Sequence, residues 1–306
     1  MHTSTWQHLI NKKKSFNLND PSAHSPVELW KSSSFPDDVL SLEDFRRTFL
    51  SGGAINPPDR PNFLHQNAKY EDEDLFGQVK WFFKLIRRLM KLQLHSFRNR
   101  RKFFFYYPDK SRKKFRRISL FDNYLMDLSI RVSYYLSVLS DQRECKDKFT
   151  VLEIGGGFGA LSTIYCLKSP HSTYYLVDLP ENLLISYINL REAGIPVTTI
   201  ENLPSDFSGV VLLTGNEIAK VHNCDFVINT MSFQHMNKVN IEYYFSNIFR
   251  IQPRKIYLVN RSVKRDLTDI SIFDYPNDPR YRLVRENSIF TDEHIEQEWE
   301  LRTKGV

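Results

Sequence analysis

The residues best suited to chemistry lie in a glycine-rich segment near the middle of the chain, VLEIGGGFGALS at 151–162. Glycine has no Cβ atom, so a turn built from glycines lets a ligand approach the backbone closely. The spacing Gly155-x-Gly157-x-x-Ala160 also fits the fingerprint of dinucleotide-binding proteins. The glycines alone therefore leave open an NAD-dependent oxidoreductase as one alternative.

Two neighbours of these glycines favour a cofactor that carries an amino acid. Glu153 lies two residues before the first glycine, where a carboxylate can orient an ammonium group. Gly159 completes the spacing E-x-G-x-G-x-G, which keeps the backbone open beside a methionine moiety. The pattern predicts that S-adenosylmethionine binds here, and the expected contacts are Glu153, Gly155, Gly156, Gly157 and Gly159.

A second carboxylate follows at the end of the next apolar stretch, YYLVD, which closes with Asp178. A carboxylate at that strand end accepts hydrogen bonds from ribose hydroxyls in nucleotide-binding folds. An isolated acid there would more often cap a helix starting at Pro180. The glycine turn 19 residues earlier favours the ribose role. Further cofactor contacts are expected from Leu179, Glu201 and Asn202.

The segment DFVINTMSFQHM, residues 225–236, carries the candidates for catalysis. Its strand should end near Asn229, which we expect to contact the cofactor, and the residues up to His235 should border the reacting group. An imidazole, with a usual pKa of about 6.5, can take a proton from a hydroxyl near neutrality. His235 is the expected base, although a histidine with a purely structural role is an equal alternative. The runners-up are His222 and His294.

The elements that position these residues are short apolar strands alternating with helices from Phe149 onward. Such alternation predicts a doubly wound α/β domain with a mostly parallel sheet and ligands at the carboxyl ends of its strands. YRLVREN and EWELRTK read as two final strands joined by a short helical stretch, the last one antiparallel. The six earlier strands are expected at 149–154, 173–178, 197–200, 209–213, 224–229 and 255–260.

The first half of the chain has a different texture. Prolines punctuate residues 1 to about 60, where short helices such as Ser41–Leu50 are expected. Longer helical patterns follow at 72–97 and 119–140. We predict an N-terminal helical cap region at 1–118, folded over the cofactor, and a cofactor-binding domain at 119–306.

Positive charge is concentrated in the segment 79–117, which holds 15 Lys or Arg against one acid, Asp109. A solvated helix face accounts for such a segment, and so does an anionic partner. A nucleic-acid-binding protein or RNA methyltransferase is the corresponding alternative, although the sequence NTMS after the strand near Asn229 differs from base-methylating motifs. Arginines expected to recognise a phosphate or carboxylate of the substrate are Arg112, Arg116 and Arg117.

Cysteine usage and hydropathy indicate the compartment. The three cysteines show no CxxC spacing, which argues against a disulfide framework and a cysteine zinc site. No close carboxylate pair has the spacing of metal ligands, so no metal is expected. No apolar run is long enough for a signal sequence or a membrane span. A cytoplasmic protein is expected, with a homo-oligomer left open.

Beyond these patterns, the sequence resembles the sugar O-methyltransferases found in bacterial surface-polysaccharide and secondary-metabolite gene clusters. The resemblance covers roughly residues 120–306. It runs through VLEIGGGFGALS, YYLVDLPENL, DFVINTMSFQHM, KIYLVNR, FDYP and HIEQEWELR.

This resemblance implies a class I methyltransferase fold, which is Rossmann-like, with S-adenosylmethionine as donor. The implied acceptor is a hydroxyl of a sugar or glycosylated metabolite. The implied substrate-binding residues are Ser232, Gln234 and Arg261. One departure concerns the base, because the family usually carries a glutamate where this chain has His235.

Overall fold

A computed structural model describes residues 75–99, 101, 123–142, 148–157, 159–264 and 270–302. The chain divides into two compact units, with the break between Asp141 and Gln142. The domain boundary predicted at 118 precedes this break and stays a prediction. The expected helix at Ser41–Leu50 and the arginines at 112, 116 and 117 lie outside the described residues.

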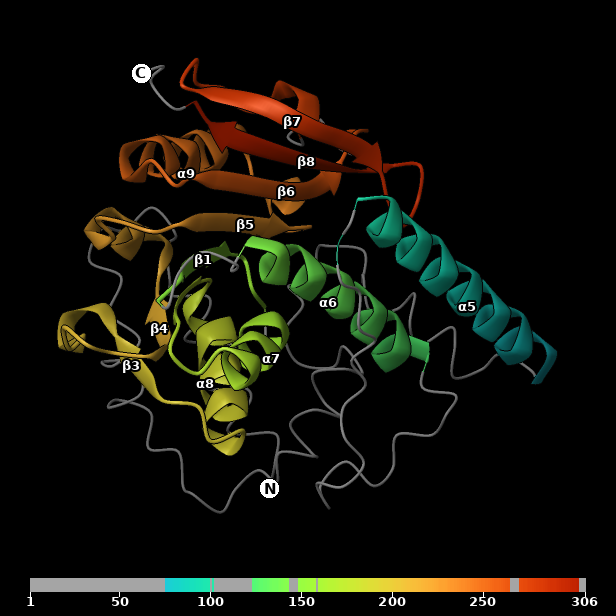
Figure 1. Cartoon of the computed structure of the whole chain (residues 1–306), viewed down its shortest axis with the longest axis horizontal. Helices are drawn as coiled ribbons and strands as arrows, with labels where there is room; N and C mark the ends of the chain where they lie inside the picture. The colour runs from blue at the N-terminus through green and yellow to red at the C-terminus, as the bar shows by residue number, and fades with distance from the viewer. Residues whose placement is uncertain are drawn as a thin grey trace. The chain divides into compact units, whose positions relative to one another are not determined.

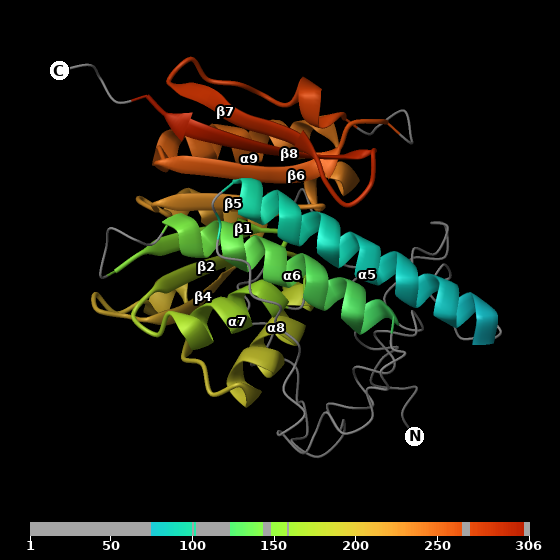
Figure 2. The ribbon, with the colours of Figure 1, turned by 45° about the vertical axis from the view of Figure 1, so that its right-hand side comes forward.

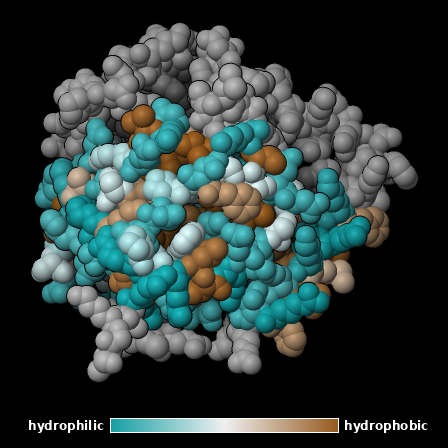
Figure 3. Space-filling view, turned by 90° about the horizontal axis from the view of Figure 1, so that it is seen from above, coloured by the Kyte–Doolittle hydropathy of each residue, from teal (hydrophilic) through white to brown (hydrophobic). Residues whose placement is uncertain are grey.

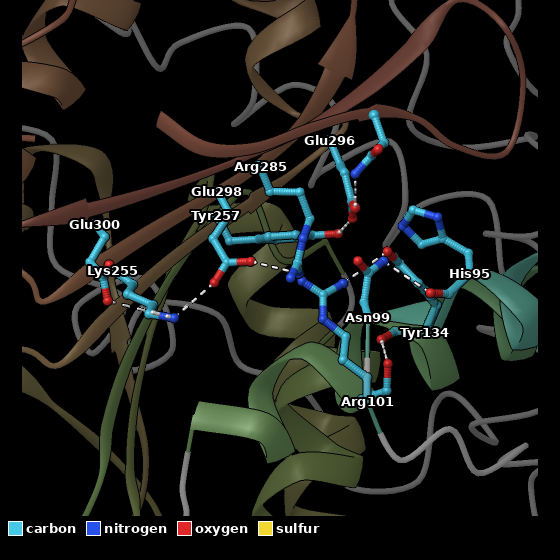
Figure 4. A network of polar contacts seen from close by, with 12 residues as sticks. His95, Asn99, Arg101, Tyr134, Lys255, Tyr257, Arg285, Glu296, Glu298 and Glu300 are labelled. Atoms are coloured by element: carbon cyan, nitrogen blue, oxygen red, sulfur yellow. Dashed lines mark hydrogen bonds and ion pairs between the residues drawn. The ribbon is translucent and has the colours of Figure 1, made fainter. Parts of the chain in front are cut away.

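The first unit contains two long helices, α5 (Leu75–Arg98) and α6 (Asn123–Gln142), of which α6 ends at the break with its last residue in the second unit. They confirm the helical patterns predicted at 72–97 and 119–140. All side chains from Val132 to Leu139 of α6 are buried, as expected for a helix enclosed on every side. Within this unit, Arg101 Nη1 donates to the Tyr134 hydroxyl at 3.0 Å (Figure 4).

The second unit is built on an eight-stranded sheet with the order β3-β4-β2-β1-β5-β6-β8-β7 (Figure 1). All pairs from β3 to β6 are parallel, which confirms the predicted parallel sheet. Each of the six predicted strands is present. The strands are β1 Thr150–Ile154, β2 Thr173–Val177, β3 Val197–Thr199, β4 Gly209–Leu213, β5 Phe226–Thr230, β6 Lys255–Arg261, β7 Tyr281–Ser288 and β8 His294–Leu301.

Helices cover both faces of this sheet, which confirms the doubly wound α/β fold. On one face lie α7 (Ala160–Lys168) and α8 (Pro180–Glu192), and on the other lies α9 (Lys238–Ile251) (Figure 2). Strand residues alternate between the faces, so Leu152 and Ile154 pack in one buried cluster with residues of α9. The short 3₁₀ helices are η2 Ile200–Asn202, η3 Gly215–Lys220, η4 Phe233–His235 and η5 Ile272–Asp274.

The far end of the sheet is antiparallel. Strand β8 lies between β6 and β7 and runs antiparallel to both, as predicted for the closing strand. The link between β7 and β8 is a turn and not the short helical stretch that was expected. One face of this end carries buried charge, because Lys255 Nζ and Arg285 Nη1 each donate to Glu298 at 2.9 Å (Figure 4). These bonds compensate the cost of burying that carboxylate.

The surface seen in Figure 3 is mainly hydrophilic, with hydrophobic side chains in small separate groups. Among the described residues, no helix combines the length and the apolar character needed to cross a bilayer.

Candidate cofactor and active site

The candidate residues gather at the point where the strand order reverses. From β1 the chain proceeds to β2, β3 and β4 on one side, and then crosses to β5 on the other side of β1. In parallel sheets, ligands bind outside the carboxyl ends of the strands at this point. The glycine turn leaves β1 and residues 231–235 leave β5, so two segments about 75 residues apart share one edge (Figure 1).

Glycine occupies the positions of the turn for different structural reasons. Gly155, Gly157 and Gly159 have φ of 78°, 61° and 76°, a region that other residues rarely adopt. A Cβ on Gly155 would overlap Ser232 Oγ, and one on Gly159 would lie 3.2 Å from Ser186 Oγ. At Gly157 nothing lies within 4 Å of the Cβ position. The turn is therefore packed at its two ends and open at Gly157.

Glu153 lies beneath this turn as a buried acid. Its side chain is 2% exposed, and the Tyr174 hydroxyl donates to Oε2 at 2.9 Å. A Cβ on Gly156 would lie 2.7 Å from the same oxygen and would overlap Leu176 Cδ1, so a larger residue there would displace these buried side chains. Burial raises the pKa of Glu153 to about 8. The carboxyl is thus mostly protonated at neutral pH, and its role toward an ammonium group stays a prediction.

This burial leads to a stability prediction for Glu153→Gln. The pKa in the folded protein exceeds the ordinary value of 4.5, so the contribution of Glu153 to stability is complete below about pH 4.5. It is lost as the pH rises toward 8, at a slope of about 1.4 kcal/mol per pH unit. Gln stays neutral, so the variant should lack this slope and unfold at higher urea than the wild type at pH 8.

Urea unfolding at several pH values between about 5 and 8.5 measures the difference. Glu242→Gln, which changes an exposed glutamate of α9, is the matched control and should follow the wild type. Parallel stability curves for the wild type and Glu153→Gln would show that Glu153 is ionised in the folded protein.

Asp178 joins the glycine turn to helix α8. Its Oδ2 accepts from Gly157 N at 2.6 Å, and its Oδ1 accepts from Leu179 N at 2.7 Å and Asn182 Nδ2 at 2.8 Å. The capping role that the sequence left as an alternative is not present, because the N-cap of α8 is Leu179 and no side chain caps this helix. The carboxylate is held beside the open part of the turn by its bond to Gly157 N. Its role toward a ribose stays a prediction.

Helix α8 supplies two residues that sequence analysis missed. Asn182 holds Asp178, and Ser186 Oγ donates to Gly157 O at 2.8 Å. They are four residues apart and so share one helix face. Nothing in the sequence marks them, since polar residues four apart are common on helices.

Strand β3 follows β2 in the sequence but does not lie beside it in the sheet. The strand that pairs with β2 is β4, whereas β3 lies at the sheet edge. Glu201 and Asn202 follow β3, and Lys220 Nζ donates to Glu201 Oε1. This position does not favour a contact of Glu201 and Asn202 with adenine or its ribose. That contact stays a prediction.

The segment beside Asp178 is instead the one that follows β4. Asp178 N donates to Leu213 O at 3.2 Å, so Thr214 and Gly215 are its neighbours. A Cβ on Gly215 would lie 2.7 Å from the Tyr244 hydroxyl of α9. Sequence analysis missed this group, because the order of β3 and β4 in the sheet is not visible in their patterns.

At the end of β5, Asn229 joins three segments of the chain. The side chain is fully buried, and its Nδ2 donates to Ile154 O and to Ser232 Oγ, both at 2.8 Å. Its Oδ1 accepts from Asn260 Nδ2 at 2.8 Å. Asn229 thus ties β1, β6 and the segment after β5 together, while its predicted contact with the cofactor stays a prediction.

The chain leaves β5 through a strained residue. Met231 has φ of 59°, which is uncommon for a residue other than glycine, and its N–H donates to Val259 O at 2.6 Å. Such conformations persist where the surrounding structure imposes them, often at functional sites. The turn places Ser232 against Gly155 and starts η4.

Gln234 and His235 lie side by side on η4. Gln234 is 5% exposed, and its Nε2 lies 3.2 Å from His235 Nε2. The amide N–H can only donate, so in this arrangement neutral His235 accepts at Nε2 and carries its proton on Nδ1. Gln234 Oε1 is buried and has no hydrogen-bond partner among the described residues. His235 itself is exposed.

The other predicted residues lie in different places. Arg261 is buried at the carboxyl end of β6, and its partner on β8 is His294. His222 precedes β5 and so lies near the amino ends of the parallel strands, whereas the glycine turn lies at their carboxyl ends. This placement favours His235 and His294 over His222 as a base. No cluster of three or more metal-ligating side chains exists among the described residues, and the expectation of no metal stays a prediction.

Comparison with known proteins finds solved structures that are similar to this chain in structure. No family model and no curated protein matches the chain. A methyltransferase from Aquifex aeolicus, described as SAM dependent, is 12% identical with a TM-score of 0.39, covering 54% of this chain and 88% of that one. An rRNA methylase from Streptococcus thermophilus is 14% identical with a TM-score of 0.38, covering 55% of this chain and 96% of that one.

The likeness is one of fold. Similarity this distant is too weak to indicate a cofactor, a substrate or a reaction, and the strand order and the site geometry come from the chain itself.

Proposed function

We propose that the chain is an S-adenosylmethionine-dependent methyltransferase that acts on a hydroxyl of a sugar or glycosylated metabolite. The observation that carries the proposal is the open side of Gly157. It lies in an E-x-G-x-G-x-G turn at the reversal of the strand order, with the Asp178 carboxylate bound to its N–H at 2.6 Å. A larger residue at 157 would fill this space, so the glycine fits a ligand.

The residues around the turn fit this cofactor. Gly157 provides backbone without a side chain, Asp178 provides a carboxylate for ribose hydroxyls, and Thr214 and Gly215 border the adenine side. Glu153 would face the ammonium group, which favours its ionised form. When bound, S-adenosylmethionine supplies a methyl group already activated by its sulfonium, so the protein mainly orients the acceptor and removes a proton.

The residues after β5 support a hydroxyl acceptor. Gln234 Oε1 is a buried acceptor without a partner among the described residues, and a sugar hydroxyl is a donor that can satisfy it. The adjacent His235 can accept the hydroxyl proton at Nε2 if the hydroxyl replaces the Gln234 amide as the donor to that nitrogen. Gln234 would therefore orient the hydroxyl, and His235 would deprotonate it.

Calorimetric titration with S-adenosylmethionine and NAD⁺ in parallel tests the cofactor. Binding of S-adenosylmethionine without binding of NAD⁺ is expected. The reverse result would contradict the proposal and favour the oxidoreductase. Methyl transfer from labelled cofactor to a panel of nucleotide sugars and glycosides, with RNA as the competing acceptor, tests the hydroxyl assignment.

Asp178→Ala should weaken binding of S-adenosylmethionine by about 1.5–3 kcal/mol, the range for a hydrogen bond to a charged group. Asn182→Ala is the matched control, because it removes one donor to Asp178 and keeps the carboxylate. The control should bind nearly as well as the wild type in the same titration. Equal affinity of Asp178→Ala and wild type would remove the ribose assignment.

A further inference from the structure

Helix α5 exposes a row of large apolar side chains. Met90 is 64% exposed, Leu94 51% and Phe97 79%. Their spacing of four and three residues places them on one side of the helix. Phe83, 65% exposed, lies seven residues before Met90 on the same side. Scattered apolar residues on a surface are ordinary, but an aligned row along one helix indicates an interaction surface.

Basic side chains lie directly beside this row. At 100° per residue, the exposed Lys84, Arg87, Lys91 and Arg98 form a stripe that adjoins the apolar row on one side. Helix α5 contains no Asp or Glu from Leu75 to Arg98. The buried side chains Leu85 and Leu92 lie on the remaining face. The exposed side of α5 therefore carries an apolar row beside a basic stripe, and we call these two rows of side chains the α5 face.

We propose that the α5 face binds the surface of a lipid bilayer rich in anionic headgroups. A basic helix with Phe, Leu and Met on its apolar side lies in the plane of a membrane, because its apolar groups enter the acyl boundary while its cations meet lipid phosphates. The long stems of Lys and Arg allow their charges to stay at headgroup level. With 24 residues, α5 would lie about 36 Å along the surface.

The apolar row distinguishes this partner from nucleic acid. Binding to phosphate backbones depends on positive charge and leaves side chains such as Leu94 and Met90 exposed to water. A bilayer accommodates both stripes of the α5 face at once. None of these residues belongs to the candidate site, so membrane binding and methyl transfer can be tested independently.

Co-sedimentation of the full-length chain with vesicles tests the proposal. The vesicles are phosphatidylcholine alone, or phosphatidylcholine with about one third phosphatidylglycerol. Binding is expected only to the anionic vesicles, and added salt should weaken it. A variant that removes three of the four cations of the basic stripe should lose about 10- to 100-fold in affinity. This variant combines Lys84→Gln, Arg87→Gln and Lys91→Gln.

Two further variants separate charge from apolar insertion. Met90→Gln combined with Phe97→Gln keeps every charge and should still lose most binding, since the apolar contribution is removed. The matched control removes three exposed charges from the other unit, through Lys148→Gln, Lys168→Gln and Lys238→Gln, and should bind like the wild type. All of these side chains are exposed, so thermal unfolding should be nearly unchanged.

Three outcomes would overturn the proposal. The first is no binding of the wild type to anionic vesicles at low salt. The second is equal binding of the wild type and the Met90→Gln, Phe97→Gln variant. The third is binding to duplex RNA or DNA that depends on the basic stripe without binding to vesicles, which would assign the α5 face to nucleic acid.

Discussion

Gly157→Val should abolish S-adenosylmethionine binding and leave the protein folded. Apart from the chain neighbours, no atom lies within 4 Å of the Cβ position at Gly157, so a Cβ has room there and the new side chain projects into the space proposed for the cofactor. The φ of 61° is unfavourable for a β-branched residue, so we expect a destabilisation of about 1–2 kcal/mol. Calorimetric titration and thermal unfolding measure the two effects separately.

Gly194→Val is the matched control for this variant. Gly194 has φ of 75°, and nothing lies within 4 Å of its Cβ position, so the backbone strain is similar. It follows the end of α8 and lies away from the glycine turn. The control should lose similar stability and keep cofactor affinity. Normal affinity in Gly157→Val would show that the cofactor does not occupy this space.

Substitution of Gly155, which is packed against Ser232, should affect stability and not only cofactor binding. A Cβ on Gly155 would overlap the Ser232 side chain, so Gly155→Ala should disturb the contact between the ends of β1 and β5. A loss of stability is expected from this variant even without cofactor. The pair Gly155→Ala and Gly157→Val therefore separates the structural part of the turn from the binding part.

His235→Ala should lower kcat by about 10²–10⁴-fold, the usual contribution of a positioned acid–base group. Cofactor affinity should stay nearly unchanged, because His235 belongs to η4, whereas the glycine turn and Asp178 follow β1 and β2. The measurement is steady-state methyl transfer to saturating amounts of the acceptor identified in the panel, together with a cofactor titration. His235→Glu should keep part of the activity, since a carboxylate is also a base.

His222→Ala is the matched control, because that exposed histidine lies near the amino ends of the parallel strands, away from His235 at their carboxyl ends. Its kcat should equal that of the wild type. Near-normal kcat in His235→Ala would end the assignment, and the role of base would pass to His294, which is paired with Arg261 at the carboxyl end of β6.

Much of the scaffold was predictable because it depends on local pattern. Strands such as VVLL at 210–213 are apolar throughout and alternate with helices, so a parallel sheet buried on both faces is the consistent solution. Right-handed crossovers between parallel strands limit the possible topologies further. The glycine turn was visible for the same reason, since a run of glycines at a strand end is typical of a tight turn that backbone or ligand atoms approach closely.

Several features depended on tertiary structure. The order of β3 and β4 in the sheet is set by which strand packs better in the interior. The fully buried β4 lies beside β2, and the three-residue β3 forms the edge. This order brings Thr214 and not Glu201 to Asp178.

The sequence by itself determined the parallel α/β scaffold, the glycine turn and the carboxylate at the end of β2, because each follows from periodicity or from backbone needs within a few residues. Only the tertiary structure decided the surroundings of Glu153, whose pKa rises to about 8 because burial removes the carboxyl from water, against the lowering effect of its hydrogen bond from Tyr174. It also decided the contact of Ser232 with Gly155 and the buried oxygen of Gln234. The reason is physical, since burial and close approach depend on segments about 75 residues apart that meet only when the sheet assembles.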